Sequence, residues 1–487
     1  MDNEIKVKKK NPTLRFIALL LAVLLPLPLL VAAVVFTPTI YSETFLGALA
    51  PKLDRLKNTE GERIIVVGGS SVAFGLDSEL LSKNTGYEVI NFGLYATLGT
   101  RIMLDLSRDE IREGDIVVLA PELDPQTLSM YFNGEAVWQA ADSDLSILSR
   151  VHPDNFLDMA AASFGYISQV LGRTLTGAGK LDPEGIYRRD SFNEYGDISY
   201  PREYNVMTAG YDVNQKVSLT PDIYDAKFIE YLNGYIADAE KKGATVCYTF
   251  CPVNRSALAE GTTDESIEEF YKFVLESINC PIISDPNELL MHEDYFYDTN
   301  FHLNDAGATV RTAMLIGDLN RLLGRTQQLE IELPSPPKKP QTEAPDEWTE
   351  NEWSDIFLYE DFGGGLKIVG VREDARNKTE LTLPYKAGGK TVAVIGRGAF
   401  ADCKNLRELT LHENISLAED GAFSGADALE KIHIYHEDPD SFEVGDGLFS
   451  GAPDALRLHF YTQTSYDSFT AGYWWGKFSA RMVNSAQ

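Results

Sequence analysis

The stretch IIVVGGSSVAFG, residues 64–75, decides how the rest of the chain is interpreted. Four aliphatic residues in a row suit a strand that is buried on both faces of a parallel sheet. The strand then breaks into two glycines and two serines, a composition typical of a tight turn. At the carboxyl edge of a parallel sheet, such a turn faces the crevice where ligands bind. The stretch therefore predicts a serine hydroxyl at the rim of an α/β sheet.

Similar aliphatic runs alternate with amphipathic segments as far as residue 324. The predicted strands are 64–67, 88–91, 116–119, 244–250 and 281–284, and the predicted helices are 99–112, 224–242, 264–278 and 304–323. The last helix has Asn304 as its expected cap. Strands and helices in alternation predict a doubly wound α/β fold with a parallel sheet.

One connection, residues 122–223, is far longer than the two to six residues that usually join such elements. A helix is predicted over 154–172, and the rest is rich in Tyr, Gly, Asp and Arg. Two interpretations stay open for this insertion. It is a lid whose rings stack on a sugar, or it is a decorated surface segment. The rings concerned are Tyr187, Tyr195, Tyr200 and Tyr204.

A serine needs a base to become a nucleophile, and His302 is the best placed. It lies in YDTNFHLNDAGA just before the last predicted helix, with Asp298 four residues upstream. That loop and the first turn end at the same rim of the sheet, so Ser71, His302 and Asp298 are expected to converge. Asp298 would orient the imidazole, His302 would take the proton, and Ser71 would form the acyl-enzyme. The alternative is that Ser71 only caps a helix.

These residues resemble the SGNH (GDSL-type) hydrolase and acyltransferase superfamily. Its first block, G-D-S-x-x-x-G, resembles residues 69–75 with Ser71 as the nucleophile and Ser70 at the usual Asp position. Its second block resembles NFGLYA, where Asn91 and Gly93 match and Ala96 stands at a second glycine. The resemblance implies a flavodoxin-like sheet and implies that Asn91, Gly93 and Ala96 support the oxyanion.

The third block departs from the family. Where the family has an asparagine that donates to the oxyanion, this chain reads VVLAPELD and places Glu122 or Leu123 there. An ionised glutamate only accepts hydrogen bonds. Losing one oxyanion donor costs about 10²–10³ in rate. Glu122 is therefore predicted to orient the insertion or to bind a substrate hydroxyl, the alternative being that the chemistry has been lost.

The N-terminus predicts a membrane anchor. Residues 16–36 contain no charge and would form a helix of about 31 Å. Basic residues crowd the segment 1–15, which places it in the cytoplasm and everything after about residue 40 on the outer side. The alternative is a cleaved secretory signal, whose apolar core is usually about 7–15 residues.

The C-terminal third contains a repeat. Phe400, Phe423 and Phe449 recur in similar contexts 23 and 26 residues apart, within the period of leucine-rich repeats. The pattern resembles the BspA-type repeats of bacterial surface proteins, which implies adhesion or the binding of a wall or protein ligand. The alternative is a small spacer. The predicted organisation is a basic tail (1–15), a membrane helix (16–36), the SGNH-like domain (60–325, with the insertion 122–223), a proline-rich linker (326–352) and the repeat domain (353–487).

The composition of the chain limits the classes of function that it can have. A net charge of −30 argues against nucleic acid as the main partner. The four cysteines are too scattered for a disulfide framework, and no metal or cofactor is predicted. The expected function is a membrane-anchored, extracytoplasmic serine esterase or O-acyltransferase acting on acyl or acetyl esters of cell-envelope polysaccharide or peptidoglycan. The alternative is a non-catalytic surface binding protein built from a decayed hydrolase fold and the repeats.

Overall fold

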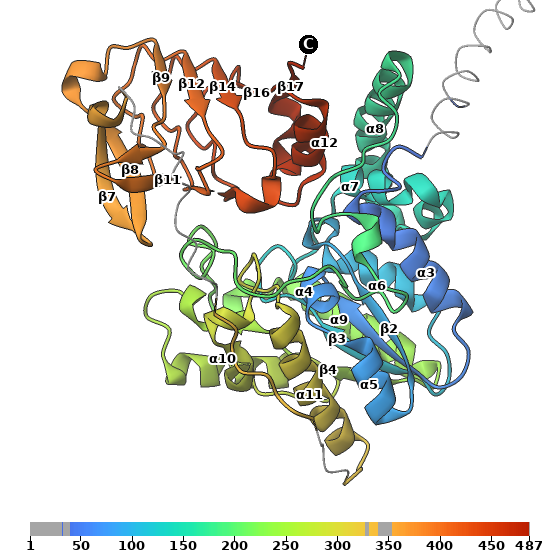
Figure 1. The fold of residues 1–487 in the computed structure, drawn as a ribbon. Helices are drawn as coiled ribbons and strands as arrows, with labels where there is room; N and C mark the ends of the chain where they lie inside the picture. The colour runs from blue at the N-terminus through green and yellow to red at the C-terminus, as the bar shows by residue number, and fades with distance from the viewer. Residues whose placement is uncertain (1–31, 33–38, 327–330, 339–352, 487) are drawn as a thin grey trace, which may run out of the picture.

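A computed structural model describes residues 32, 39–326, 331–338 and 353–486 of the chain. Within these residues the polypeptide forms an α/β domain and a domain of stacked strands, which lie against each other (Figure 1). The predicted tail and nearly all of the predicted membrane segment 16–36 fall outside the described residues, as does most of the linker. No helix in the described part of the chain is both long enough and apolar enough to cross a bilayer.

The centre of the α/β domain is a sheet of four parallel strands in the order β2-β1-β3-β4. The strands are β1 Arg63–Gly68, β2 Glu88–Gly93, β3 Ile116–Ala120 and β4 Thr245–Tyr248. Every residue of β1 is buried, as its aliphatic run predicts. The strand predicted at 281–284 is reduced to a single parallel bridge between Tyr248 and Ile282.

Helices cover both faces of this sheet, which confirms a mixed α/β fold built on a parallel sheet. Ile65 and Val67 of β1 pack in the larger core, and the alternate residues Ile64 and Val66 pack in a smaller core under the last helix. The helices are α3 Leu49–Asn58, α4 Ser70–Phe74, α5 Ser78–Thr85, α6 Thr100–Arg108, α9 Ala226–Lys241, α10 Asp264–Ser277 and α11 Asp305–Leu322. The Asn304 side chain caps α11 as predicted, by accepting from the backbone N–H of Gly307.

The long insertion begins with two helices and continues mostly as coil. The helices are α7 Gly134–Ala140 and α8 Phe156–Thr176, the second close to the predicted 154–172. A two-stranded pair, β5 Val253–Asn254 and β6 Leu290–Met291, follows later in the domain.

The C-terminal domain consists of two ladders of short, mainly parallel strands. One ladder contains β9 Glu380–Thr382, β12 Glu408–Leu411, β14 Lys431–Ile434, β16 Arg457–Phe460 and β17 Met482–Asn484. The other contains β7 Phe357–Phe362, β8 Gly365–Val371, β10 Lys386–Ala387, β11 Lys390–Ile395, β13 Leu417–Ala418 and β15 Glu443–Val444. The rings of Phe400, Phe423 and Phe449 stack with centroids 6.0 and 5.6 Å apart, so the repeated phenylalanines occupy equivalent positions.

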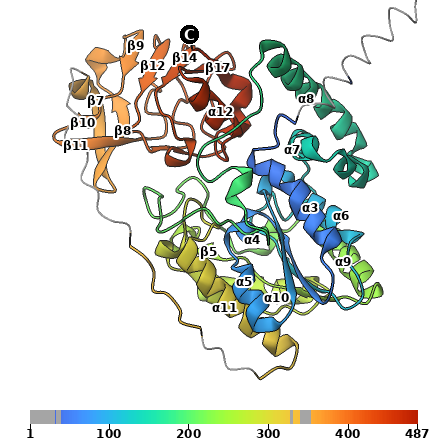
Figure 2. The same cartoon turned by 45° about the vertical axis from the view of Figure 1, so that its right-hand side comes forward.

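The repeat domain docks on the α/β domain through helix α12 Gln463–Ala471, the segment after it and the ends of its strands (Figure 2). Asp467 pairs with Arg173 of α8 at 3.0 Å. The Tyr95 hydroxyl donates to the carbonyl of Tyr473 at 2.9 Å. These contacts bring one end of the repeat array to the carboxyl edge of the parallel sheet.

Candidate active site

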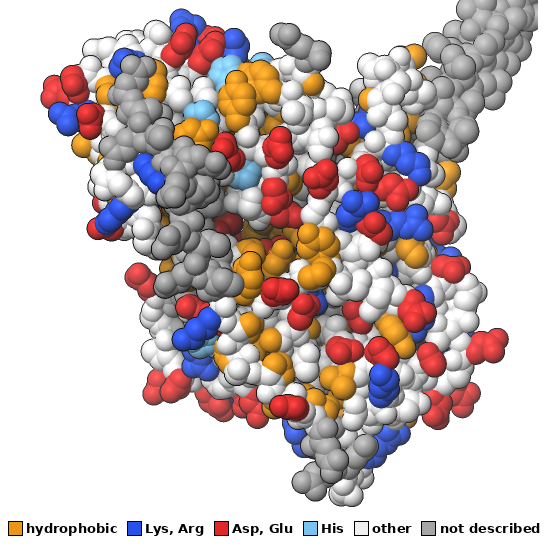
Figure 3. All heavy atoms as spheres, viewed as in Figure 1, with side chains coloured by type: hydrophobic (Ala, Val, Ile, Leu, Met, Phe, Trp, Pro, Cys, Tyr) orange, Lys and Arg blue, Asp and Glu red, His pale blue; other side chains and the backbone are white. Residues whose placement is uncertain are grey.

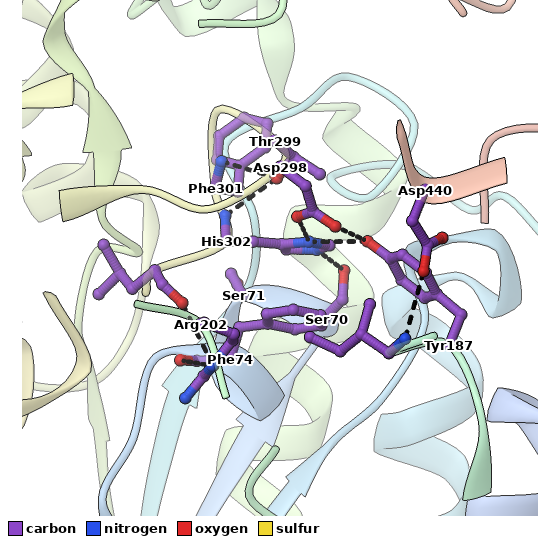
Figure 4. A network of polar contacts seen from close by, with 12 residues as sticks. Ser70, Ser71, Phe74, Tyr187, Arg202, Asp298, Thr299, Phe301, His302 and Asp440 are labelled. Carbon is purple, nitrogen blue, oxygen red and sulfur yellow. Dashed lines mark hydrogen bonds and ion pairs between the residues drawn. The ribbon is translucent and has the colours of Figure 1, made fainter. Parts of the chain in front are cut away.

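A serine near the start of the α/β domain's sequence and a histidine near its end meet at the carboxyl edge of the sheet (Figure 4). Ser70 is the first residue of α4 and follows β1 almost directly. His302 lies in the loop before α11. The Nε2 atom of His302 is 2.8 Å from the Oγ atom of Ser70, which is the contact a general base needs with a hydroxyl nucleophile.

The serine that His302 contacts is Ser70, whereas the spacing of the sequence motif predicts Ser71. The Ser71 hydroxyl is buried and finds no hydrogen-bond partner among the described residues. Successive residues on a helix point about 100° apart, so only one of two adjacent serines can face the imidazole. The sequence motif favours Ser71 because Gly75 lies four residues after it. In the structure, however, Gly75 has a packing role: a Cβ atom there would overlap the carbonyl oxygen of Ser71. The glycine therefore does not identify the nucleophile.

Asp298 lies on the other side of the His302 ring from Ser70. Its Oδ1 atom is 2.8 Å from Nδ1 of His302, and its Oδ2 atom accepts a hydrogen bond of 2.5 Å from the Tyr187 hydroxyl. The loop between the two residues is held by Thr299, whose hydroxyl accepts from the backbone N–H groups of Phe301 and His302. The five-residue turn therefore holds aspartate and histidine in contact despite its extra residue.

Aromatic rings fix the plane of the imidazole. The ring of Phe74 stacks on His302 with centroids 3.9 Å apart and an angle of 9°. The ring of Tyr473, from the repeat domain, meets the same imidazole edge-on at 5.3 Å. Burial raises the pKa of Tyr473 well above its usual value, and the nearby Ser70 side chain acts in the opposite direction. Ser70 is completely buried under these groups.

Glu122 contacts both serines. Its Oε1 atom accepts from the backbone N–H of Ser71 at 2.6 Å and from the Ser70 hydroxyl at 3.0 Å. Gly69 leaves space for this carboxyl group, because a Cβ atom there would lie 2.8 Å from Oε1. Burial raises the pKa of Glu122, while the nearby imidazole of His302 and the Ser71 N–H act in the opposite direction.

The position of the Glu122 proton decides what His302 can do. The Ser70 hydroxyl has a single hydrogen to donate. With Glu122 ionised, Ser70 donates to Glu122, and His302 can only contact Ser70 by donating through Nε2. With Glu122 neutral, the Ser70 hydrogen is free to point at His302, which is the arrangement of a nucleophile and its base.

The residues predicted to support the oxyanion have other partners. The Asn91 amide donates to the carbonyl of Val72 at 2.9 Å and to Asp197 at 2.8 Å. The backbone N–H of Gly93 donates to the Asn91 side chain at 3.1 Å. These two residues therefore hold β2 against α4. Ala96 lines a cavity between the two domains.

Tyr187 and Tyr473 are the site residues whose role the sequence does not reveal. Tyr187 belongs to the predicted set of sugar-stacking rings, but its hydroxyl is bonded to Asp298. Tyr195 of the same set lies over the guanidinium group of Arg55. Tyr473 belongs to a different domain, and nothing in the local sequence links it to His302. Among the described residues, no three or more His, Cys, Asp or Glu side chains are arranged to hold a metal ion.

Comparison with known proteins finds only remote likeness. No protein-family model and no curated protein matches the chain. A leucine-rich cell surface protein of Faecalibacterium prausnitzii loosely matches the repeat part, with 15% identity and a TM-score of 0.19 over 26% of this chain and 31% of its own. A Bacillus subtilis protein designated YXIM matches with 13% identity and a TM-score of 0.25 over 54% of this chain and 57% of its own. The chain thus spans about a third of the first protein and a little over half of the second.

Proposed function

We propose that this chain is a serine esterase or O-acyltransferase that acts on acyl or acetyl esters of cell-envelope glycans. The observation that carries the proposal is the line of contacts from Ser70 through His302 to Asp298, with 2.8 Å at each step. A hydroxyl, an imidazole and a carboxylate in this order form the arrangement that activates serine for attack on a carbonyl carbon.

The reaction follows from the positions of these groups. The Ser70 oxygen attacks the carbonyl carbon of the ester, and its proton passes to Nε2 of His302. Asp298 accepts from Nδ1 and stabilises the imidazolium ion. His302 then returns the proton to the departing alkoxide, which leaves an acyl group on Ser70. Water or the hydroxyl of a second sugar then attacks the acyl-enzyme while His302 takes its proton. His302 passes this proton to the Ser70 oxygen as the acid or the new ester leaves, so the cycle balances without a cofactor.

The resemblance to SGNH enzymes supports this proposal and also identifies where the chain departs from them. With Ser70 as the nucleophile, Gly69 occupies the usual aspartate position and Glu122 the usual asparagine position. The two changes are physically linked, because the missing side chain at Gly69 makes room for Glu122. We propose that Glu122 acts in its neutral form, in which it does not oppose the oxyanion.

The cellular setting is part of the same proposal. The uncharged segment 16–36 would anchor the chain in the cell membrane with both domains outside the cytoplasm. Polysaccharide or peptidoglycan would then be within reach, and the repeats would contact the wall or a protein ligand.

A second candidate is a surface binding protein without catalytic activity. Two observations favour it: Ser70 is completely buried, and the Glu122 carboxyl group bonds to the nucleophile and to the N–H beside it. In this alternative the same contacts only stabilise the fold.

Labelling with a fluorophosphonate probe separates the two candidates. The probe forms a covalent bond only with an activated serine, so the wild-type chain should label. Ser70→Ala should abolish labelling, whereas the matched variant Ser71→Ala should retain it. Labelling that survives Ser70→Ala, or a folded wild-type protein that never labels over a pH series, would overturn the enzyme proposal.

A further inference from the structure

A cavity of about 410 Å³ lies between the α/β domain and the repeat domain. Residues such as Asn133 and Gln139 line it on one side, and Asp446 and Trp474 line it on the other. The volume lies within the range of small-molecule binding sites. We propose that this cavity binds an oligosaccharide of neutral or amino sugars, so that the repeat domain builds half of the substrate site rather than a remote docking module.

The indole N–H of Trp474 is a buried hydrogen-bond donor that needs an acceptor. The Trp474 side chain is only 6% exposed, and its Nε1–H has no hydrogen-bond partner among the residues that the structure describes. A buried N–H group is costly to leave unpaired. Because Trp474 lines the cavity, a shift of its ring on binding would pair this N–H with a hydroxyl or amide oxygen of the sugar.

The charge of the cavity excludes anionic ligands. Lys477 in the wall forms an ion pair with Asp446. Among the described residues that line the cavity, no other lysine and no arginine offsets the remaining carboxyl groups, and burial raises the pKa of Asp212 to about 6. Such a wall attracts hydroxyl and ammonium donors and repels carboxylates and phosphates. The lining carboxyl groups are Asp124, Glu135, Asp212, Asp420 and Asp446.

Aromatic rings supply the apolar part of the site. Tyr473 packs between Tyr95 and Trp474, with centroids 5.0 and 4.9 Å away, and all three line the cavity. Rings next to many hydrogen-bonding groups match a carbohydrate, which presents C–H faces and a rim of hydroxyls.

The cavity is adjacent to the catalytic groups. Tyr187 and Tyr473 line it and also contact the His302 side chain. A sugar in the cavity would therefore be separated from the Ser70 hydroxyl by one aromatic side chain. Binding itself does not depend on the proposed reaction, but the role of the sugar as substrate rests on the proposed function.

The test measures binding without turnover. Calorimetry on the Ser70→Ala full-length chain uses three probes: chitotetraose, its de-N-acetylated form, and tetragalacturonate. The first two should bind and the anionic third should not. Trp474→Phe keeps an aromatic ring but loses the N–H, and should weaken binding at least three- to tenfold, as expected for the loss of one hydrogen bond. The matched control Trp353→Phe, outside the cavity, should leave binding unchanged.

A second variant covers the case in which Trp474→Phe fails to fold. Gln139→Trp places a large ring into the cavity from the α/β side and should abolish binding. The proposal is overturned if neither neutral nor amino oligosaccharide binds, if tetragalacturonate binds equally well, or if the cavity variants change nothing. Fluorophosphonate labelling of the chain with Ser70 intact reports the proposed function separately, so the failure of one claim is distinguishable from the failure of the other.

An independent observation concerns helix α8. Four large apolar side chains on it are exposed: Phe156 by 71%, Leu157 by 78%, Phe164 by 76% and Leu175 by 84%. Leu157, Phe164 and Leu175 are 7 and 11 residues apart, which places them on one face of the helix. The helix lies at the edge of the molecule (Figure 1). Exposed apolar rows of this kind mark interaction surfaces.

The path of the chain indicates what covers this face. Ile40 and Tyr41 pack against Tyr166 and Val170 on the opposite side of α8. The uncharged segment 16–36 ends only a few residues earlier, and three extended residues span at most about 11 Å. We propose that the exposed row of α8 lies in the surface of the lipid bilayer beside the predicted anchor and thereby orients the α/β domain.

Spin labelling of the full chain in nanodiscs of phosphatidylcholine and phosphatidylglycerol tests this contact. With Cys280→Ser as background, a label at Phe164→Cys should collide more with oxygen than with a water-soluble nickel complex. The control label at Leu275→Cys, on the exposed surface of α10, should show the reverse preference. Equal behaviour of the two labels, or a chain that does not enter the nanodisc at all, would overturn the proposal.

Discussion

The ring edge of Tyr473 rests against the imidazole of His302, with centroids 5.3 Å apart, although the two residues belong to different domains. The Ser70 side chain is close enough to this phenol to lower its pKa, against the larger effect of burial. The repeat domain therefore covers the nucleophile directly. Tyr473 packs against the core of the α/β domain, so access of an ester to Ser70 requires the Tyr473 side chain to move.

We expect Tyr473→Ala to increase the rate at which a fluorophosphonate labels Ser70. The substitution removes the ring that covers a completely buried hydroxyl. The rate is measured by stopped-time labelling and gel fluorescence. Tyr435→Ala, which truncates an exposed ring elsewhere in the repeat domain, is the control and should leave the rate unchanged. Slower labelling of Tyr473→Ala would mean that the phenol takes part in the chemistry instead of covering it.

We expect Tyr187→Phe to reduce the labelling rate about tenfold. The Tyr187 hydroxyl donates a 2.5 Å hydrogen bond to Asp298, and a hydrogen bond to a charged group contributes about 1.5–3 kcal/mol. Without it, Asp298 holds the imidazole less firmly. The change should appear in the rate at saturating probe more than in the probe concentration that gives half the maximal rate. A Tyr195→Phe variant, whose ring lies over Arg55, should match the wild type.

We expect Glu122→Gln to flatten the pH dependence of stability. Burial raises the pKa of Glu122 in the folded state above the unfolded value near 4.5. Below pH 4.5 the group is neutral in both states. As the pH rises through the raised value, the folded state gives up its proton at a cost that the unfolded state does not bear, so stability is lost. Glutamine cannot ionise, so the melting temperature of the variant should exceed that of the wild type by a margin that grows above pH 4.5.

Glu276→Gln on the exposed surface of α10 is the control for this series and should follow the wild-type curve. Parallel curves for Glu122→Gln and the wild type would show that Glu122 is ionised in the folded state without penalty. In that case the neutral form proposed for catalysis would have no support.

The sequence predicts the sheet well because the patterns that specify strands and helix caps involve only neighbouring residues. The aliphatic run of β1 and the Asn304 cap of α11 act over a few neighbouring residues. The pairing of Asp298 with His302 is likewise contained in one turn. The strand predicted at 281–284 shrinks to one bridge because pairing depends on the neighbouring strand, which local composition does not encode.

The site itself was predicted only in part. Adjacent serines have nearly the same local context, and the choice between Ser70 and Ser71 depends on how α4 is rotated beneath His302. The roles of Tyr187 and Tyr473 arise from contacts across more than a hundred residues, which no periodicity or spacing reveals. Asn91 and Gly93 match the expected motif in sequence, yet the hydrogen bonds of the Asn91 side chain go to α4, to Asp197 and to the Gly93 N–H.

We expect Phe423→Ala to destabilise the repeat domain by about 3–5 kcal/mol, the usual cost of deleting a buried aromatic side chain. Phe423 is 2% exposed and stacks between Phe400 and Phe449, so its loss leaves a cavity through three consecutive repeats. Denaturant unfolding followed by circular dichroism measures the change. The repeat domain carries Tyr473, which covers Ser70. At a denaturant concentration that unfolds only the repeats of the variant, Ser70 should therefore be labelled faster in Phe423→Ala than in the wild type. A destabilised variant with unchanged labelling would show that Ser70 stays covered without the repeat domain, and the role assigned to Tyr473 would be lost.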